Sequence, residues 1–259
     1  MKKYWHIWLK MTSNSFQTII ASRFGMTIFV FGKLYRLALN LGFTYFLLLG
    51  AKRLVGYDQN QVLLFLLTYI FLGSLGQMLF REAYRFRRKL VTGEFDFDLV
   101  KPVQPLFKNL TGGFDLLDLL TMPVILYLLI KVIATVNLTT VNLLLYLALM
   151  LNGLFIILAI HILVLAFGVV TTEVDNAIMV YRDLETMGRF PVDIYKEPLK
   201  LILTFVVPVG IMFTTPARGL LGLLNWPEVG LAALIGLTLT VLSLRVWAFA
   251  LRRYSSASS

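Results

Sequence analysis

Cysteine is absent from this chain of 259 residues, and charged residues are scarce at 15%. The first absence excludes disulfide bonds and thiolate metal sites. The charged fraction is well below the ~25% that is usual in soluble domains. The hydrophobic fraction of 58% exceeds the ~45–50% that is usual in such domains. A water-soluble fold of this length cannot bury so much apolar surface, whereas lipid tails solvate it directly. Composition therefore predicts an integral membrane protein.

Two further absences concern binding sites. The nearest approach to a phosphate-binding loop, residues 25–34, has the wrong spacing and lacks a Ser or Thr after Lys33. The acidic residues Glu94, Asp96 and Asp98 lack the Gly and the distal Glu of a calcium-binding loop. We therefore expect no metal site, catalytic residue or bound cofactor in this chain. If ATP powers its activity, a separate subunit must bind the ATP.

Long apolar stretches dominate what is present. Most are close to the ~20 residues that a helix needs to cross the hydrocarbon core, and they lack the strict alternation of barrel strands. The expected spans are Thr27–Leu49, Gln61–Phe80, Phe114–Val136, Val141–Val170, Leu199–Thr215 and Val229–Ala250. The predicted fold class is an all-α integral membrane protein with about six transmembrane helices. These form one domain, residues 25–254, and a frayed tail follows at residues 255–259.

The formal net charge of +10 suits either nucleic acid or the anionic cytoplasmic face of a membrane. One expected side of the membrane comprises residues 1–24, 81–113, 172–198 and 251–259. The other comprises residues 50–60, 137–140 and 216–228. The first side carries sixteen Lys and Arg residues, and the second only Lys52, Arg53 and Arg218. The positive-inside rule therefore predicts cytoplasmic termini and a membrane surface, not nucleic acid, as partner of these charges.

Two segments are expected to lie in the membrane interface. In residues 1–24, aromatic and apolar side chains recur at helical spacing on one face, opposite a polar face. The residues after Lys2 and Lys3 do not form the uninterrupted apolar run of a cleavable signal peptide. Residues 216–228 are too short to cross and begin with Pro216, so a short helix at the outer interface is expected there.

The loop of residues 81–113 combines the densest positive charge with turn-forming residues. Its first part continues the preceding span as a basic helix, which Gly93 is expected to end. Alternating acidic and aromatic residues follow, which favours a specific protein contact over a simple lipid-binding patch. We therefore expect this loop to dock a soluble partner. The expected contact residues are Arg81, Tyr84, Arg85, Arg88, Gly93, Glu94, Phe95, Asp96, Leu99 and Pro102.

Polar residues inside the spans are candidates for a translocation path. His161 and Asn152 lie well inside the fourth span, where they either line such a path or bond to a neighbouring helix. Lys33 is close enough to the cytoplasmic end of the first span to extend toward the headgroups. Arg36 is deeper, so this explanation suits it less well.

Two segments carry a family resemblance. One is residues 92–107, which begin Thr-Gly-Glu-Phe-Asp and continue through Lys101-Pro102-Val103-Gln104-Pro105. The other is Gly188–Tyr195, which is followed by Pro208 and by Pro216-Ala217. Together with the N-terminal helix and six spans, they make the chain resemble the ABC-2-type permeases of bacterial ABC transporters over nearly its whole length.

The resemblance implies a half-transporter without enzymatic activity, located in the bacterial inner membrane. Two permeases, identical or related, would sit on two ATPase subunits, and residues 81–107 would press into the ATPases. The family is mostly associated with export, including that of drug-like or viologen-type compounds. The substrate of this chain is not implied.

Two other function classes remain open at this stage. An energy-coupling scaffold like the T component of vitamin importers carries Ala-Arg-Gly on cytoplasmic helices. Here Ala217-Arg218-Gly219 matches, but charge counting places it outside. An intramembrane serine protease would pair Ser74 with His161, yet residue 72 is Leu where a rhomboid-type Gly-x-Ser pattern needs Gly.

Overall fold

The computed structural model describes residues 2–50, 53–136 and 138–255, and within these ranges every regular element is helical. The predicted all-α fold class is therefore confirmed. The longer helices are α1 (Lys2–Ala21), α2 (Arg23–Gly50), α3 (Gln59–Leu79), α7 (Leu116–Ile133), α8 (Thr140–Thr171), α9 (Val174–Thr186) and α12 (Trp226–Arg252). The shorter ones are η1 (Arg81–Arg85), α4 (Phe86–Val91), α5 (Glu94–Leu99), α6 (Pro105–Thr111), η2 (Met187–Arg189), η3 (Val192–Ile194), α10 (Leu199–Leu201), η4 (Ile202–Val206), η5 (Gly210–Thr214) and α11 (Thr215–Leu220).

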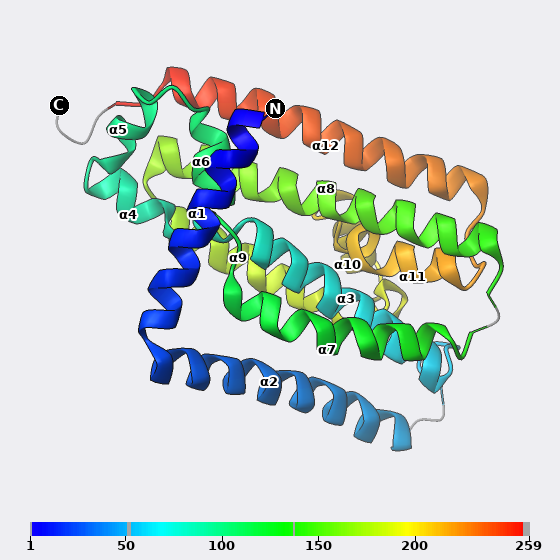
Figure 1. Ribbon diagram of the computed structural model, residues 1–259. Coiled ribbons are helices and arrows are strands. Elements are labelled where there is room, and N and C mark those ends of the chain that lie inside the picture. The colour runs from blue at the N-terminus through cyan, green and yellow to red at the C-terminus, as the bar shows by residue number, and fades with distance from the viewer. Residues whose placement is uncertain (1, 51–52, 137, 256–259) are drawn as a thin grey trace.

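The long helices form a bundle with α8 at its centre (Figure 1). α8 packs most extensively against α12 and also contacts α9, α11 and η5, so its buried residues run along its whole length. By length and composition, α3, α7, α8 and α12 can each cross a membrane, and the bent pair of residues 199–220 would be a fifth. α2 is long enough to cross but carries Lys33 and Arg36.

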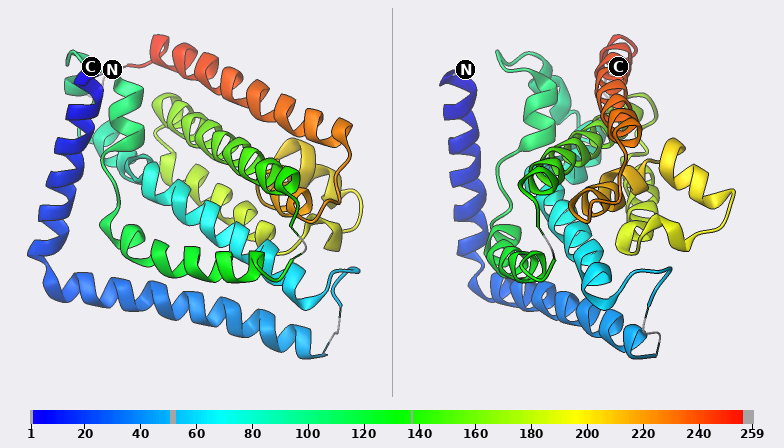
Figure 2. Two further views of the ribbon diagram at one scale, coloured as in Figure 1. Left: turned by 45° about the vertical axis from the view of Figure 1, so that its right-hand side comes forward. Right: turned by 90° about the vertical axis from the view of Figure 1, so that its right-hand side faces the viewer.

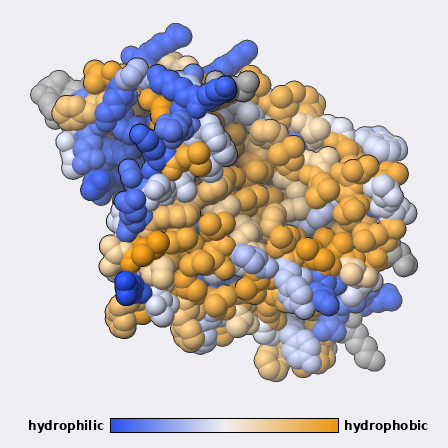
Figure 3. Space-filling model, viewed as in Figure 1, coloured by the Kyte–Doolittle hydropathy of each residue, from blue (hydrophilic) through white to orange (hydrophobic). Residues whose placement is uncertain are grey.

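The bundle has two ends that differ in chemistry. We call one the basic end; it comprises residues 81–113, α1 and the last turn of α12 (Figures 1 and 2). The other, the opposite end, comprises residues 53–58, 221–225 and the first turn of α8. Hydrophilic side chains gather over the basic end, while apolar side chains cover most of the visible bundle surface (Figure 3). This division is typical of a protein whose bundle lies in lipid.

The predicted N-terminal helix is present as α1 and runs across the direction of α2 (Figure 1). It is attached to the segment that leads into α7. Lys3 Nζ donates to the Pro102 carbonyl at 2.7 Å, and the Phe114 amide donates to Thr12 Oγ1 at 3.3 Å. At Gly113 (φ +102°), a Cβ atom would lie 2.8 Å from the backbone of α1. Only glycine therefore allows this close approach without strain.

α9, η2 and η3 lead from the basic end to the opposite end. Val174, at the start of α9, packs on Gly168 in the last turn of α8. Beyond α9, the Tyr57 hydroxyl donates to Asp193 Oδ2 at 3.1 Å, and Tyr57 belongs to the opposite end. The prediction that residues 172–198 lie together on the cytoplasmic side is therefore wrong. The other thirteen counted Lys and Arg residues lie in residues 1–24, 81–113 and 251–259.

The expected fifth span, residues 199–215, is also corrected. Its helix breaks after Val206 and resumes at Gly210, with a bend of 75°. Lys200, near its start, lies 2.8 Å from Asp193, and Arg218, near the end of the bent pair, lies 3.6 Å from Glu228 in the first turn of α12. Both contacts are at the opposite end, so the pair enters the bundle and returns to the end from which it came.

The short helix expected after Pro216 exists as α11, with Pro216 in its first turn. It is buried rather than superficial, because Pro216, Ala217 and Leu220 are covered within the bundle. A Cβ at Gly219 would lie 2.9 Å from the Leu149 side chain of α8. Lys52 and the tail residues 256–259 lie outside the described residues.

Candidate functional site

At the basic end, a buried carboxylate holds three helices together. Asp98 of α5 is only 3% exposed and accepts a hydrogen bond from Lys108 of α6. Lys101 and Lys89 lie 3.4 and 3.7 Å from the same carboxylate. Burial by itself raises the pKa of Asp98, but the Lys108 hydrogen bond and the three lysine charges outweigh it and hold the pKa below its usual value. We call these four residues the Asp98 cluster.

A second contact fixes the α4–α5 turn to the bundle. The Phe95 side chain is fully buried, and its ring lies edge-on to Phe86 at 5.1 Å and to Tyr254 at 5.0 Å. On the outer side of the same short helix, Phe97 is 66% exposed, and Val100 just beyond is 81% exposed. The turn is therefore an anchored projection that presents apolar side chains at the basic end.

The remaining residues expected to contact a partner differ in their surroundings. Arg81 forms an ion pair with Asp115 at the start of α7. Arg85 and Arg88 are more exposed, and Arg88 lies 3.5 Å from Glu94. Gly93 has φ +72° and joins α4 to α5, Leu99 and Pro102 are exposed, and Asp96 is half-buried. The structure therefore brings these residues to one end of the bundle, but the fully buried Phe95 and Tyr84, which lines an internal cavity, are not placed to contact a partner.

A cavity of about 320 Å³ lies inside the bundle between α2, α3, α7, α8 and α9. Its charged lining residues are Lys33, Arg36, Arg182, Arg189, Asp118, Asp183 and Glu185. Lys33 forms an ion pair with Asp118 of α7, so it does not extend toward the headgroups as expected. Within the described ranges, no group of three His, Asp or Glu side chains is placed to hold a metal ion.

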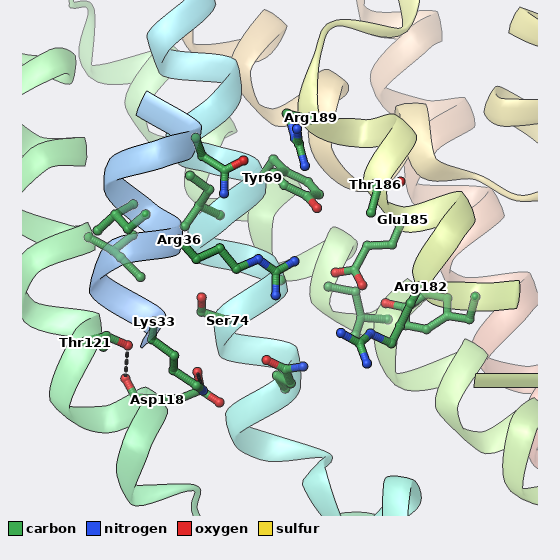
Figure 4. A pocket seen from close by; sticks show the side chains of 18 of the residues that line it. Lys33, Arg36, Tyr69, Ser74, Asp118, Thr121, Arg182, Glu185, Thr186 and Arg189 are labelled. Atoms are coloured by element: carbon green, nitrogen blue, oxygen red, sulfur yellow. Dashed lines mark hydrogen bonds and ion pairs between the residues drawn. The ribbon is translucent and has the colours of Figure 1, made fainter. Parts of the chain in front are cut away.

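The three arginines of the cavity are not neutralised in this way. Arg36 of α2 points toward α9, and Arg182 and Glu185 of α9 point back toward α2 (Figure 4). Among the residues that the structure describes, Arg36, Arg182 and Arg189 have no carboxylate oxygen within the 4.0 Å of an ion pair. Arg189 Nε is buried without a hydrogen-bond partner. The cavity thus offers uncommitted guanidinium donors.

The two candidates for a translocation path lie in different places. His161 lines the cavity; its Nδ1 lies 2.8 Å from the Ile157 carbonyl and its Nε2 lies 3.3 Å from the Tyr84 hydroxyl. Asn152 is not among the cavity residues and donates to the Ala232 carbonyl of α12 at 3.0 Å. Ser74 also lines the cavity, but both ring nitrogens of His161 are engaged by other groups. This arrangement does not support a Ser–His catalytic pair.

Sequence reasoning missed the contribution of α9 to the cavity. Residues 172–198 are charged and fall between two apolar stretches, so the sequence predicts a cytoplasmic segment there. A signal was present: Val174, Ile178 and Tyr181 recur at helical spacing and are the buried residues of α9. A helix with one apolar face and one charged face fits a position beside a polar cavity.

These features define a multi-pass helical membrane protein with a charged internal cavity and an anchored projection at one end. The family model described as "ABC-2 family transporter protein" matches residues 34–258, which is most of the chain. The chain therefore belongs to the ABC-2 transporter family, as the sequence resemblance indicated. Comparison with curated proteins and with solved structures gives no match.

Proposed function

We propose that this chain is the transmembrane permease subunit of an ATP-driven exporter. It forms half of the translocation path, and a second identical or related permease forms the other half. A separate ABC ATPase subunit hydrolyses ATP and contacts residues 81–107. Family membership supports the membrane component of a transporter; the ATPase, the second permease and the direction of transport are parts of the proposal.

The observation that carries the coupling role is the α4–α5 projection. Phe95 and the Asp98 cluster hold its base rigidly, whereas Phe97 and Val100 face outward. Exposed apolar side chains on a well-anchored element are typical of a protein contact. A rigid base is required because a movement of the ATPase must be transmitted to α8 and α12 rather than absorbed by a flexible loop.

The excess of positive charge at the basic end supports cytoplasmic termini in a bacterial inner membrane. In this orientation the projection faces the compartment that contains ATP. Ala217-Arg218-Gly219 then lies at the opposite end, away from any cytoplasmic ATPase. This position does not favour the energy-coupling scaffold.

The test is co-purification of the ATPase with the double variant Phe97→Ala/Val100→Ala. We expect at least a tenfold weaker association, because these side chains contribute contact area and no internal packing. The matched control is Phe24→Ala/Phe46→Ala, which removes equally exposed apolar side chains from α2. The proposal fails if the ATPase binds both double variants as it binds the original protein.

A further inference from the structure

Arg36 of the cavity lies too far along α2 to be solvated by headgroups. Arg36 lies thirteen residues into α2, or about 20 Å from its start at ~1.5 Å per residue, and the hydrocarbon core is ~30 Å thick. An unpaired charge at such a depth is costly and is tolerated in a water-filled cavity or beside a counter-ion. The Arg36 charge therefore requires compensation, and Arg182 and Arg189 line the same cavity.

The acidic residues of the cavity supply only part of this compensation: the charge of Glu185 acts on Arg182 and Arg36, but its oxygens lie beyond the 4.0 Å of an ion pair. Asp118 is occupied by Lys33. The Glu185 carboxylate lies against α3, where a Cβ at Gly73 would be 2.9 Å from its Oε1. Asp183 is exposed, and no described basic group lies within ion-pair distance of it. After Lys33 and Asp118 neutralise each other, three arginines remain against two carboxylates.

We propose that the cavity binds the acidic group, a carboxylate or phosphate, of an amphiphilic substrate, with Arg36, Arg182 and Arg189 as its counter-ions. This proposal rests on the proposed transport function and names its substrate class. Guanidinium groups bind carboxylate and phosphate oxygens through paired N–H donors, which suits such a site. The buried Arg189 Nε has no partner in the described structure and is one such donor.

The walls of the cavity suit the remainder of an amphiphile. Ile70, Ile125 and Ile157 supply apolar surface, and the hydroxyl groups of Tyr69 and Tyr84 supply polar contacts. Binding sites for small molecules commonly combine mainly apolar walls with a few polar groups that fix orientation. A volume of about 320 Å³ is at the lower end of the ~300–1,000 Å³ usual for such sites, so it fits a headgroup and the beginning of a chain.

The absence of cysteine provides a direct binding assay. Ser74 lines the cavity, so a Ser74→Cys variant carries one thiol at the site. The purified protein is placed in phosphatidylcholine nanodiscs, and the rate of thiol labelling is measured with and without dodecyl phosphate below its micelle concentration. We expect dodecyl phosphate to slow labelling at least tenfold, and the cation dodecyltrimethylammonium to have no effect.

Two further arms distinguish the sources of the acidic group. Phosphatidylglycerol in the nanodisc tests a membrane lipid, whereas dodecyl phosphate in a phosphatidylcholine disc tests a soluble amphiphile. Protection in either arm supports the proposal and assigns the source. If inorganic phosphate protects the thiol to the same extent as dodecyl phosphate, the apolar walls contribute nothing to binding. The part of the proposal that names an amphiphilic substrate is then overturned.

Variants test whether the arginines are responsible. Arg36→Gln and Arg182→Gln, each combined with Ser74→Cys, should lose the protection, and Arg182→Lys should keep part of it. The matched control is Arg245→Gln, which removes an exposed arginine of α12 that does not line the cavity. Three outcomes would each overturn the proposal. These are protection by the cation, equal protection in the Gln variants, and labelling that is blocked only when two copies share a disc. The assay uses neither ATPase nor transport, so its outcome is separate from that of the coupling test.

Discussion

The basic end and the cavity both concentrate charged side chains, but the two regions differ in how far ion pairs within the chain neutralise these charges. At the basic end the buried carboxylate of Asp98 is surrounded by Lys89, Lys101 and Lys108. In the cavity, Arg36 and Arg182 have no ion-pair partner among the described residues. Charges compensated within the chain stabilise one shape, whereas uncompensated charges favour binding of something from outside. The comparison separates a structural role from a binding role without reference to conservation.

The sharpest test of the comparison is Asp98→Ala. Removal of this carboxylate leaves Lys101 and Lys108 without an ion-pair partner, whereas Lys89 keeps its ion pair with Glu82 at 2.8 Å. Loss of a partner costs ~3–5 kcal/mol for fully buried pairs. Because Lys108 and Lys101 are partly exposed, we expect a smaller loss of about 2–3 kcal/mol. The measurement is the thermal unfolding midpoint in detergent.

The control for this change is Asp175→Asn, which breaks an ion pair with Arg87 in which both side chains are about half exposed. An exposed pair contributes ~0–1 kcal/mol, so the midpoint should move little. Equal midpoints for the Asp98 and Asp175 variants would show that the Asp98 cluster has no special role in stability.

The next test concerns the attachment of α1 to the basic end. Gly113→Ala places a methyl group 2.8 Å from the α1 backbone at φ +102°, a conformation that alanine disfavours by ~1–3 kcal/mol. We expect a loss of about 2 kcal/mol and faster proteolysis between α1 and α2. Gly32→Ala is the matched control, since nothing lies within 4 Å of its added methyl. Unchanged proteolysis in Gly113→Ala would contradict the close approach.

Acid should weaken the basic end through Asp98. Its pKa in the folded protein is below the usual value, so the stability that its charge contributes is complete above about pH 4 and is lost as the pH falls through the folded pKa. The difference in unfolding midpoint between the original protein and Asp98→Asn should therefore be constant from pH 7 to 5 and shrink below pH 4. If the difference in unfolding midpoint grew on acidification, the direction assigned to the pKa shift of Asp98 would be wrong.

The smallest effect on stability is expected in the cavity. Arg182→Gln removes an exposed charge that forms no ion pair, so the free energy of unfolding should change by less than about 0.5 kcal/mol. Thermal unfolding of this variant in phosphatidylcholine discs checks this expectation. A loss as large as that of Asp98→Ala would mean that Arg182 is structurally compensated after all, and the comparison between the two regions would fail.

Much of the fold follows from hydropathy and local signals. The helices α3, α7, α8 and α12 coincide closely with expected spans, because their apolar side chains leave no alternative to a membrane or a bundle interior. The end of α4 at Gly93 also follows, since its φ of +72° suits glycine. Phe95 is expected to contact a partner, but the structure buries it against Tyr254 of the distant C-terminal segment, a contact that no local pattern could reveal.

Two of the errors, the placement of α9 and that of residues 199–215, have a common physical cause. Hydropathy averages a segment over all its faces, so α9, with Arg182 and Glu185 directed into a cavity, resembles a cytoplasmic loop. The same averaging makes residues 199–215 resemble a crossing, because it ignores the break at Val207–Val209, where Pro208 cannot donate a backbone hydrogen bond. Both positions depend on neighbours that only the assembled bundle provides.

The path of α9 through the bundle has a consequence for how the chain is built into a membrane. Arg182 and Asp183 of α9 each oppose entry of a lone helix into lipid by ~2.5–3.5 kcal/mol at its centre, or roughly 5–7 kcal/mol in total. α9 therefore cannot partition into the bilayer by itself as it leaves the ribosome. It can enter only beside a helix that is already in place, and α8, against which it packs, directly precedes it in the chain.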